Sequence, residues 1–446
     1  MTAARSGIMS KNLFFKGTLI LTSAGMLTKL IGFFYRIFLS HAIGAQGLGI
    51  YQLLMPVQTL VMAISTTGIQ TAISRLAAGD FALGKSDHAR DKFTIGTICA
   101  FLISSGISII LYRNADFFAV QILKESRTAS LIRLLSFSFP LGTLHTCINS
   151  FSFARKKTVI PSAIQLIEQI VRVGVSYLLY LIFLSEGREI TPVIAVGGTL
   201  AGEFAAALTS LLCIGWHFQA NHYSPLKQKN TGQNLREIFH MSVPLTLNRV
   251  LLTLLGSIEV VLIPQQLRAF GLDSSEALSI YGIFTGMAMP LILFPSAVTN
   301  SASVMLMPSI AELQALGYKK RIRYVTSKAS FGCLLLGIAC WTLFFFFGKP
   351  LGILLFKSPT AGNYIQTLAF ICPFLYLNTT LSSILNGLGK PGICLTHNVI
   401  GLCTRISFVL LVIPKIGIRG YLYGILISES ILSALHLRAL LFSHNP

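Results

Sequence analysis

Long runs of apolar residues, separated by short polar segments, recur from one end of the chain to the other. Most runs reach about 20 residues, the length that an α-helix needs to cross the hydrocarbon core of a membrane. Short alternating segments, which are typical of transmembrane β-barrels, do not occur. The pattern therefore predicts an all-α membrane protein with twelve transmembrane helices, at residues 15–40, 48–75, 93–112, 131–153, 160–184, 192–216, 239–264, 279–308, 329–347, 365–387, 392–413 and 421–441.

The two halves of the chain resemble each other. LGIY matches LSIY, and SFSFPLGTLHTCINSFSFARKKT aligns without a gap with AFICPFLYLNTTLSSILNGLGKP, at residues 48–51 and 278–281 and at residues 136–158 and 369–391. The second alignment places Pro140 on Pro373, and the same offset places Arg172 on Arg405. Repeated segments at matching positions indicate an internal duplication.

The duplication predicts two pseudo-symmetric six-helix bundles. We expect an N-terminal bundle at 1–222, a polar cytoplasmic linker at 223–236 and a C-terminal bundle at 237–446. Because six is an even number, both repeats enter the membrane in the same direction, and two such bundles enclose a central cavity. This architecture suits a transporter that works by alternating access.

Charged residues are few, and their placement carries topological information. They make up 11% of the chain, against about 25% in soluble proteins, and the net charge is +20. Lys and Arg concentrate in the loops on one side of the predicted membrane, as in YKKRIR at 318–323. This asymmetry follows the positive-inside rule and predicts two cytoplasmic termini. The same basic segments could also bind anionic lipid headgroups. We therefore expect membrane lipids, and no nucleic acid, as partners.

The cysteines do not indicate a metal site. All eight lie within or at the ends of the predicted spans, without a CxxC motif or a histidine at ligand spacing. We expect no disulfide, no metal and no cofactor.

The first predicted helix carries two cations in LTKLIGFFYRIFLS, residues 27–40. Lys29 and Arg36 are seven residues apart, which is about two helical turns, so both point to the same side. A cation within a membrane span is costly and usually faces a protein interior or a wet cavity. Since no acid lies near them in this helix, the pair predicts an anionic partner. Phosphate and pyrophosphate groups fit that description, because Arg binds them by paired hydrogen bonds and Lys as a point charge.

Other ionisable residues also fall within predicted spans. Glu168 and Arg172 are four residues apart on one helix and can form a structural ion pair. Glu203 and Glu429 lie in the last helix of each half, where we expect them to pack with a partner or a proton. Glu259 lies in the first helix of the second half and is a candidate ion or proton site.

Two segments carry a resemblance to a known family. KGTLILTSAGMLTKLIGFFYRIFLSHAIGAQGLGIYQLLMP, followed by TTGIQTAISRLAA, resembles the N-terminal repeat of polysaccharide-type flippases in the multidrug/oligosaccharidyl-lipid/polysaccharide exporter superfamily. IEVVLIPQQLRAFGLDSSEALSIYGIFTGMAMPLILFPSAVTNSASVMLMPSIAEL is similar to the stage V sporulation protein B family and its lipid II flippase relatives.

The resemblance implies a MATE-like fold and translocation of undecaprenyl-pyrophosphate-linked oligosaccharides across the bacterial plasma membrane. It implies substrate-binding roles for Lys29 and Arg36, and with weaker support for Arg75 at the end of the second helix. Many relatives have fourteen helices, two more than are predicted here. Such a transporter needs only one chain, so we expect a monomer.

Three other functions are compatible with the same features. One is a drug or metabolite antiporter of this fold coupled to Na⁺ or H⁺, which would favour acids in the cavity. Another is a membrane enzyme of lipid-glycan metabolism, although the short outer loops lack an acid pair or a His and Asp cluster. The last is an inactive scaffold for cell-wall synthesis.

Overall fold

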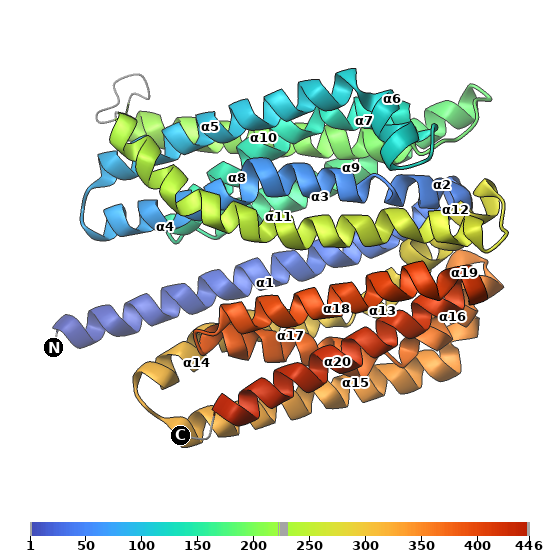
Figure 1. The fold of residues 1–446 in the computed structure, drawn as a ribbon. Coiled ribbons are helices and arrows are strands. Elements are labelled where there is room, and N and C mark those ends of the chain that lie inside the picture. Colours follow the sequence, from blue (N-terminus) through green and yellow to red (C-terminus); the bar gives the residue numbers. More distant parts are fainter. Residues whose placement is uncertain (1, 222, 224–230, 444–446) are drawn as a thin grey trace. The chain divides into compact units, whose positions relative to one another are not determined.

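The computed structural model describes residues 2–221, 223 and 231–443, and the side chains among them except those of 2–21, 304, 305, 315, 442 and 443. These residues form helices joined by short connections, with no β-strand among them (Figure 1). The elements of the first half are α1 (Thr2–Ala42), α2 (Gly44–Gln52), α3 (Met55–Met62), the π-helical η1 (Ala63–Thr67), α4 (Gly68–Ala82), α5 (Ser86–Arg113), α6 (Ala115–Phe117), η2 (Phe118–Ile122), α7 (Thr128–Ser136), α8 (Ser138–Ala154), α9 (Val159–Ser185) and α10 (Val193–Ala220).

The second half repeats much of this order. Its elements are α11 (Thr231–Ala269), α12 (Ser274–Gly282), η3 (Ile283–Ala288), α13 (Met289–Leu293), α14 (Ser296–Ala315), α15 (Lys319–Phe356), α16 (Pro359–Ala369), α17 (Cys372–Gly387), α18 (Pro391–Leu411), α19 (Ile413–Ile416) and α20 (Ile418–Ser443). Of the predicted linker 223–236, residues 224–230 lie outside the described residues, and residues 231–236 are the first turns of α11.

Local chemistry explains where several helices begin and end. α12 begins with a capping box, in which the Glu276 backbone N–H donates to Asp273 Oδ1 at 2.6 Å and the Asp273 N–H donates to Glu276 Oε2 at 3.4 Å. α17 ends before Gly389, whose φ of +69° suits a residue without a Cβ. The Lys390 N–H then donates back to the Leu385 carbonyl at 3.0 Å, which closes the last turn.

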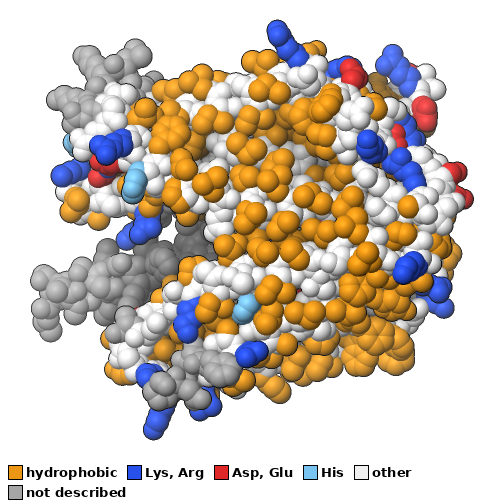
Figure 2. Space-filling model, viewed as in Figure 1, with side chains coloured by type: hydrophobic (Ala, Val, Ile, Leu, Met, Phe, Trp, Pro, Cys, Tyr) orange, Lys and Arg blue, Asp and Glu red, His pale blue; other side chains and the backbone are white. Residues whose placement is uncertain are grey.

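The described residues have the lengths and surfaces of membrane helices. Nine helical stretches among them are long and apolar enough to cross a membrane, and the number reaches eleven if two bent helix pairs each count as one span. Figure 2 shows hydrophobic side chains over most of the visible surface, while Lys and Arg gather near the helix ends. Large apolar side chains such as Trp216 and Leu354 are 80% and 77% exposed, which suits contact with lipid. The predicted all-helical membrane fold is confirmed.

The two bent pairs occupy matching places in the repeat. α7 and α8 meet at 42°, and α16 and α17 meet at 55°. Pro140 and Pro373, which the sequence alignment pairs, lie in the first turns of α8 and α17. Proline lacks an N–H and is tolerated in the first turn of a helix, so each proline suits a new helix direction directly after the bend.

The chain falls into two compact units. Unit 1 contains the chain up to Tyr35 together with Leu53–Leu254, and unit 2 contains Arg36–Gln52 together with the chain from Leu255. The long helices α1 and α11 therefore contribute residues to both units.

Unit 1 has an apolar core and a polar end. In the core, the rings of Phe93 and Phe151 stack with centroids 4.5 Å apart. At the end, Lys92 forms ion pairs of 2.9 Å with both Asp80 and Glu237 and so connects α4, α5 and α11.

Tyr223, which follows α10, contacts the same polar end. The Tyr223 hydroxyl donates to Asp91 Oδ1 at 2.7 Å. Burial raises the pKa of Tyr223, which keeps its phenol a neutral hydrogen-bond donor.

Unit 2 has its own core. Leu381, Ile384 and Leu385 on α17 are fully buried and pack with Ile310 of α14. Nearby, the buried Tyr376 hydroxyl donates to the Ile292 carbonyl at 2.7 Å, which satisfies a phenol that would otherwise be costly to bury.

Candidate functional site

The two cations of α1 lie on an unbroken helix, as the sequence predicts. Lys29 is exposed and Arg36 is half-buried. Arg75, on α4, is exposed. The ion pairs found among the described residues include none of these three cations. Each cation can therefore accept an anion without first breaking an ion pair in the described structure.

Unit 1 holds a buried polar cluster, here called the unit 1 cluster, made of His145, Glu168, Arg172 and Glu203. Arg172 donates to Glu168, one turn earlier on α9, and its guanidinium lies 4.0 Å from Glu203 Oε1 on α10. His145 of α8 lies between the two acids, with Nε2 3.5 Å from Glu203 Oε2 and Nδ1 4.0 Å from Glu168 Oε2. Three helices thus bring two acids, one arginine and one histidine together.

Small residues on α10 make this approach possible. A Cβ at Gly198 would lie 1.9 Å from Ser176 Oγ and 2.6 Å from the Arg172 carbonyl oxygen. A Cβ at Gly202 would lie 2.9 Å from the Glu168 carbonyl oxygen. Glycines four residues apart let two membrane helices pack closely. Here the close packing of α10 against α9 places Glu203 next to Arg172.

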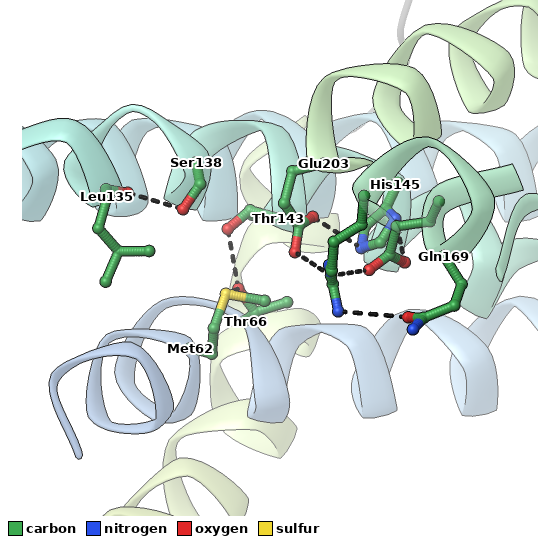
Figure 3. Close-up of polar contacts among 10 residues, drawn as sticks. Met62, Thr66, Leu135, Ser138, Thr143, His145, Gln169 and Glu203 are labelled. Carbon is green, nitrogen blue, oxygen red and sulfur yellow. Dashed lines mark hydrogen bonds and ion pairs between the residues drawn. The ribbon is translucent and has the colours of Figure 1, made fainter. Parts of the chain in front are cut away.

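Neutral polar groups surround the unit 1 cluster (Figure 3). The Gln169 amide oxygen accepts from Arg172 at 3.5 Å. The hydroxyls of Thr66, in η1, and Thr143, in α8, form a hydrogen bond of 2.9 Å. These contacts tie η1 to α8 beside the charged side chains.

Unit 2 holds a comparable group, here called the unit 2 cluster, made of Glu259, Asn378, Arg405, Tyr421 and Glu429. Arg405 Nε lies 3.0 Å from Glu259 Oε1, and Arg405 Nη1 lies 3.8 Å from Glu429 Oε1. The Tyr421 hydroxyl donates to Glu259 Oε1 at 2.7 Å. The Asn378 amide donates to Glu429 Oε2, also at 2.7 Å.

The two clusters occupy matching positions in the repeat. Arg172 and Arg405 are 233 residues apart, and so are His145 and Asn378. Glu203 and Glu429 lie on α10 and α20, the last helix of each half. Sequence reasoning matched the two arginines and the last-helix acids but missed His145 and Asn378. The gapless repeat alignment contained that signal, since it places these two residues opposite each other.

The acids predicted from the sequence therefore have partners within their own unit. Glu168 contacts Arg172, and Glu259 contacts Arg405 and Tyr421. That the first pair is structural and that Glu259 binds an ion or a proton both stay predictions.

Among the described residues, no group of His, Cys, Asp and Glu has an arrangement that could hold a metal ion. The chemistry available at these positions is anion binding by the cations and proton exchange by the acids and His145.

Comparison with known proteins places these features in a family. Residues 14–314 match the family model described as polysaccharide biosynthesis protein. Stage V sporulation protein B of Bacillus subtilis (strain 168) is 29% identical over 437 residues, which cover 96% of this chain and 83% of that protein. The lipid II flippase MurJ of the same organism is 24% identical over 435 residues, covering 88% of this chain and 76% of the flippase.

A solved structure shares the fold. It is a multidrug resistance MATE family transporter of the MOP superfamily in an inward-facing conformation, with a TM-score of 0.70 at 15% identity. The match covers 96% of this chain and 98% of the transporter. Among these similar proteins, the two whose names state an activity are a flippase and a transporter. The chain belongs to the polysaccharide biosynthesis protein family.

Proposed function

We propose that this chain is a flippase that moves an undecaprenyl-pyrophosphate-linked oligosaccharide across the bacterial plasma membrane by alternating access. The cargo is a peptidoglycan precursor such as lipid II, or another polysaccharide unit. Family membership and the similarity to the Bacillus lipid II flippase support this class of cargo.

One observation carries the proposal. The four glutamates of the two clusters have cationic or hydrogen-bonding partners, whereas Lys29, Arg36 and Arg75 take part in none of the described ion pairs. A transporter of organic cations needs acids that are available to its cargo. A transporter of a pyrophosphate lipid needs available cations, because Arg and Lys bind phosphate oxygens.

The proposed architecture has twelve spans in two six-helix bundles, with α1 as the span beyond the eleven candidates. Both termini face the cytoplasm, and one chain is sufficient. Lys29 and Arg36 hold the pyrophosphate from one side of α1, and Arg75 assists. The glycan occupies the central cavity while the isoprenoid tail stays in lipid.

Binding to the purified full-length chain tests this proposal. We expect native mass spectrometry to detect lipid II bound to the wild type and at least a tenfold weaker signal for Lys29→Ala with Arg36→Ala. Losing charge-assisted contacts to phosphate of about 1.5 kcal/mol or more accounts for a change of that size. Replacing Lys29 by Arg should retain binding, because the charge is kept.

A matched control removes two other cations. Lys349 and Lys357 are exposed and belong to no described ion pair, so Lys349→Ala with Lys357→Ala changes the net charge equally. This control should bind like the wild type. Equal lipid II binding by the wild type and the α1 variant would contradict the proposal. Binding and export of an organic cation, without lipid II binding, would instead favour an antiporter of the same fold.

A further inference from the structure

The unit 1 cluster has an unbalanced charge. With both acids ionised, Glu168 and Glu203 carry two negative charges against one positive charge on Arg172. Their side chains are 16%, 10% and 22% exposed, so water screens the excess charge only weakly. A buried uncompensated charge is costly, and binding a proton is the simplest way to remove it.

Two atoms of the cluster are available for that proton. His145 Nδ1 and Glu203 Oε2 are buried, and neither has a hydrogen-bond partner among the described residues. A proton on His145 would place an imidazolium between both carboxylates, at the 3.5 Å and 4.0 Å separations observed. A proton on Glu203 would give a neutral carboxyl group beside an imidazole. In either case one N–H or O–H bond forms, and the cluster changes from a charge of −1 to neutral.

The unit 2 cluster provides an internal comparison. It also holds two acids and one arginine, but Asn378 replaces the histidine. Both acids accept a hydrogen bond, from Tyr421 and from Asn378, and the Asn378 carbonyl oxygen accepts from Ser433 at 2.7 Å. Neutral donors thus stabilise the negative charge in unit 2, whereas unit 1 has a group that can itself take up a proton.

The geometry points to a proton-binding site in unit 1, formed by His145, Glu168 and Glu203 and holding one exchangeable proton. The charged groups that act on His145 and Glu203 are Glu168 and Arg172. The elements η1 and α3, which pack on α8, contribute the neutral Thr66 and Met62. Arg172 neutralises only one of the two acids, and Thr66 and Met62 carry no charge. A bound proton must therefore neutralise the other acid.

A metal ion fits the same place poorly. Cations such as Ca²⁺ and Mg²⁺ require several oxygen ligands around them, while here the Arg172 guanidinium already contacts both acids. No metal-binding arrangement occurs among the described His, Cys, Asp and Glu side chains. A proton needs only one lone pair, and the cluster offers two.

Proton uptake by the full-length chain in lipid nanodiscs tests the site. We expect Glu203→Gln to bind about one proton fewer than the wild type between about pH 5 and pH 8, the range in which histidine changes charge. Infrared difference spectra over the same range should show a protonated carboxyl or imidazolium band in the wild type that is lost in this variant. The matched control is Glu189→Gln, an identical change at an exposed acid, which should titrate like the wild type.

Exchanging the two clusters' distinguishing residues gives a second readout. His145→Asn installs the side chain found in unit 2, whose amide can donate to Glu203 as Asn378 donates to Glu429. It should therefore also remove the uptake, and it decides the question if Glu203→Gln does not fold. Asn378→His should add uptake in unit 2. Unchanged uptake in both Glu203→Gln and His145→Asn would overturn the proposal. The titration requires no glycan lipid, so its result is separate from the test of the proposed cargo.

Discussion

Arg405 is the residue that compensates the negative charge of the buried unit 2 cluster. It lies between Glu259 and Glu429, whose side chains are 5% and 9% exposed, and it is the only cation in the unit 2 cluster. Removing one member of a buried charge group leaves the others uncompensated, which costs more than the pair itself contributes.

We therefore expect Arg405→Gln to destabilise the protein by about 3–5 kcal/mol, a loss measurable as a lower thermal unfolding midpoint in detergent. Arg405→Lys should recover part of the loss, because the charge is kept while the fork geometry is not. Arg133→Gln is the matched control: its ion pair with Asp116 is exposed and should contribute little. An Arg405→Gln midpoint equal to that of the control would mean that the unit 2 cluster does not need its cation.

The sequence predicted some contacts between buried charged residues and missed others. The spacing of Glu168 and Arg172 was sufficient to expect a contact on α9, because residues four apart share a helix face. The partners of Glu259 were not predicted, since Arg405 and Tyr421 come from α18 and α20, more than 140 residues away. Contacts of that separation depend on helix packing and leave no local pattern in the chain.

At the scale of elements, the repeated motif from which we infer a duplication is also a packing contact. LGIY lies in α2 and LSIY lies in α12, and these two helices contact each other within unit 2. A Cβ at Gly49 would lie 2.1 Å from the Leu278 carbonyl oxygen, and a Cβ at Gly282 would lie 2.0 Å from the Ala45 carbonyl oxygen. The two short helices can cross only because each presents a glycine to the backbone of the other.

We expect Gly49→Ala to lower the unfolding midpoint, with a cost of about 1–3 kcal/mol for overpacking against a backbone that cannot move aside easily. Gly256→Ala is the control within the same unit, because a Cβ there meets no atom within 4 Å. It should leave the midpoint unchanged or raise it, since alanine favours a helix. A Gly49→Ala protein as stable as the control would show that α2 and α12 are less closely packed than described.

At the scale of the whole molecule, orientation in the membrane follows from charge. Basic segments such as the one at the start of α15, which includes Lys319, Lys320 and Arg321, lie at helix ends on the side predicted to be cytoplasmic. Translocating such segments is unfavourable, so we expect them to remain inside.

We predict that a green fluorescent protein fused after the C-terminus is fluorescent in cells. The same reporter inserted between α9 and α10, in the connection that contains Glu186 and Arg188, should be dark, because this connection is predicted to face outward. An alkaline phosphatase fusion at each place should give the opposite result. A fluorescent reporter in the connection between α9 and α10 would reverse the proposed topology.

The sequence by itself determined the class of molecule: an all-helical membrane protein of the polysaccharide biosynthesis protein family, with repeated segments that predict two duplicated halves. Hydrophobic run length and repeat matching are local properties that the chain carries without folding. Tertiary structure alone decided which buried charges on different helices meet. Glu203 reaches Arg172 and His145 because Gly198 and Gly202 let α10 pack closely against α9. Such contacts depend on the distance between helix axes and on their rotation, which hydrophobic periodicity does not specify.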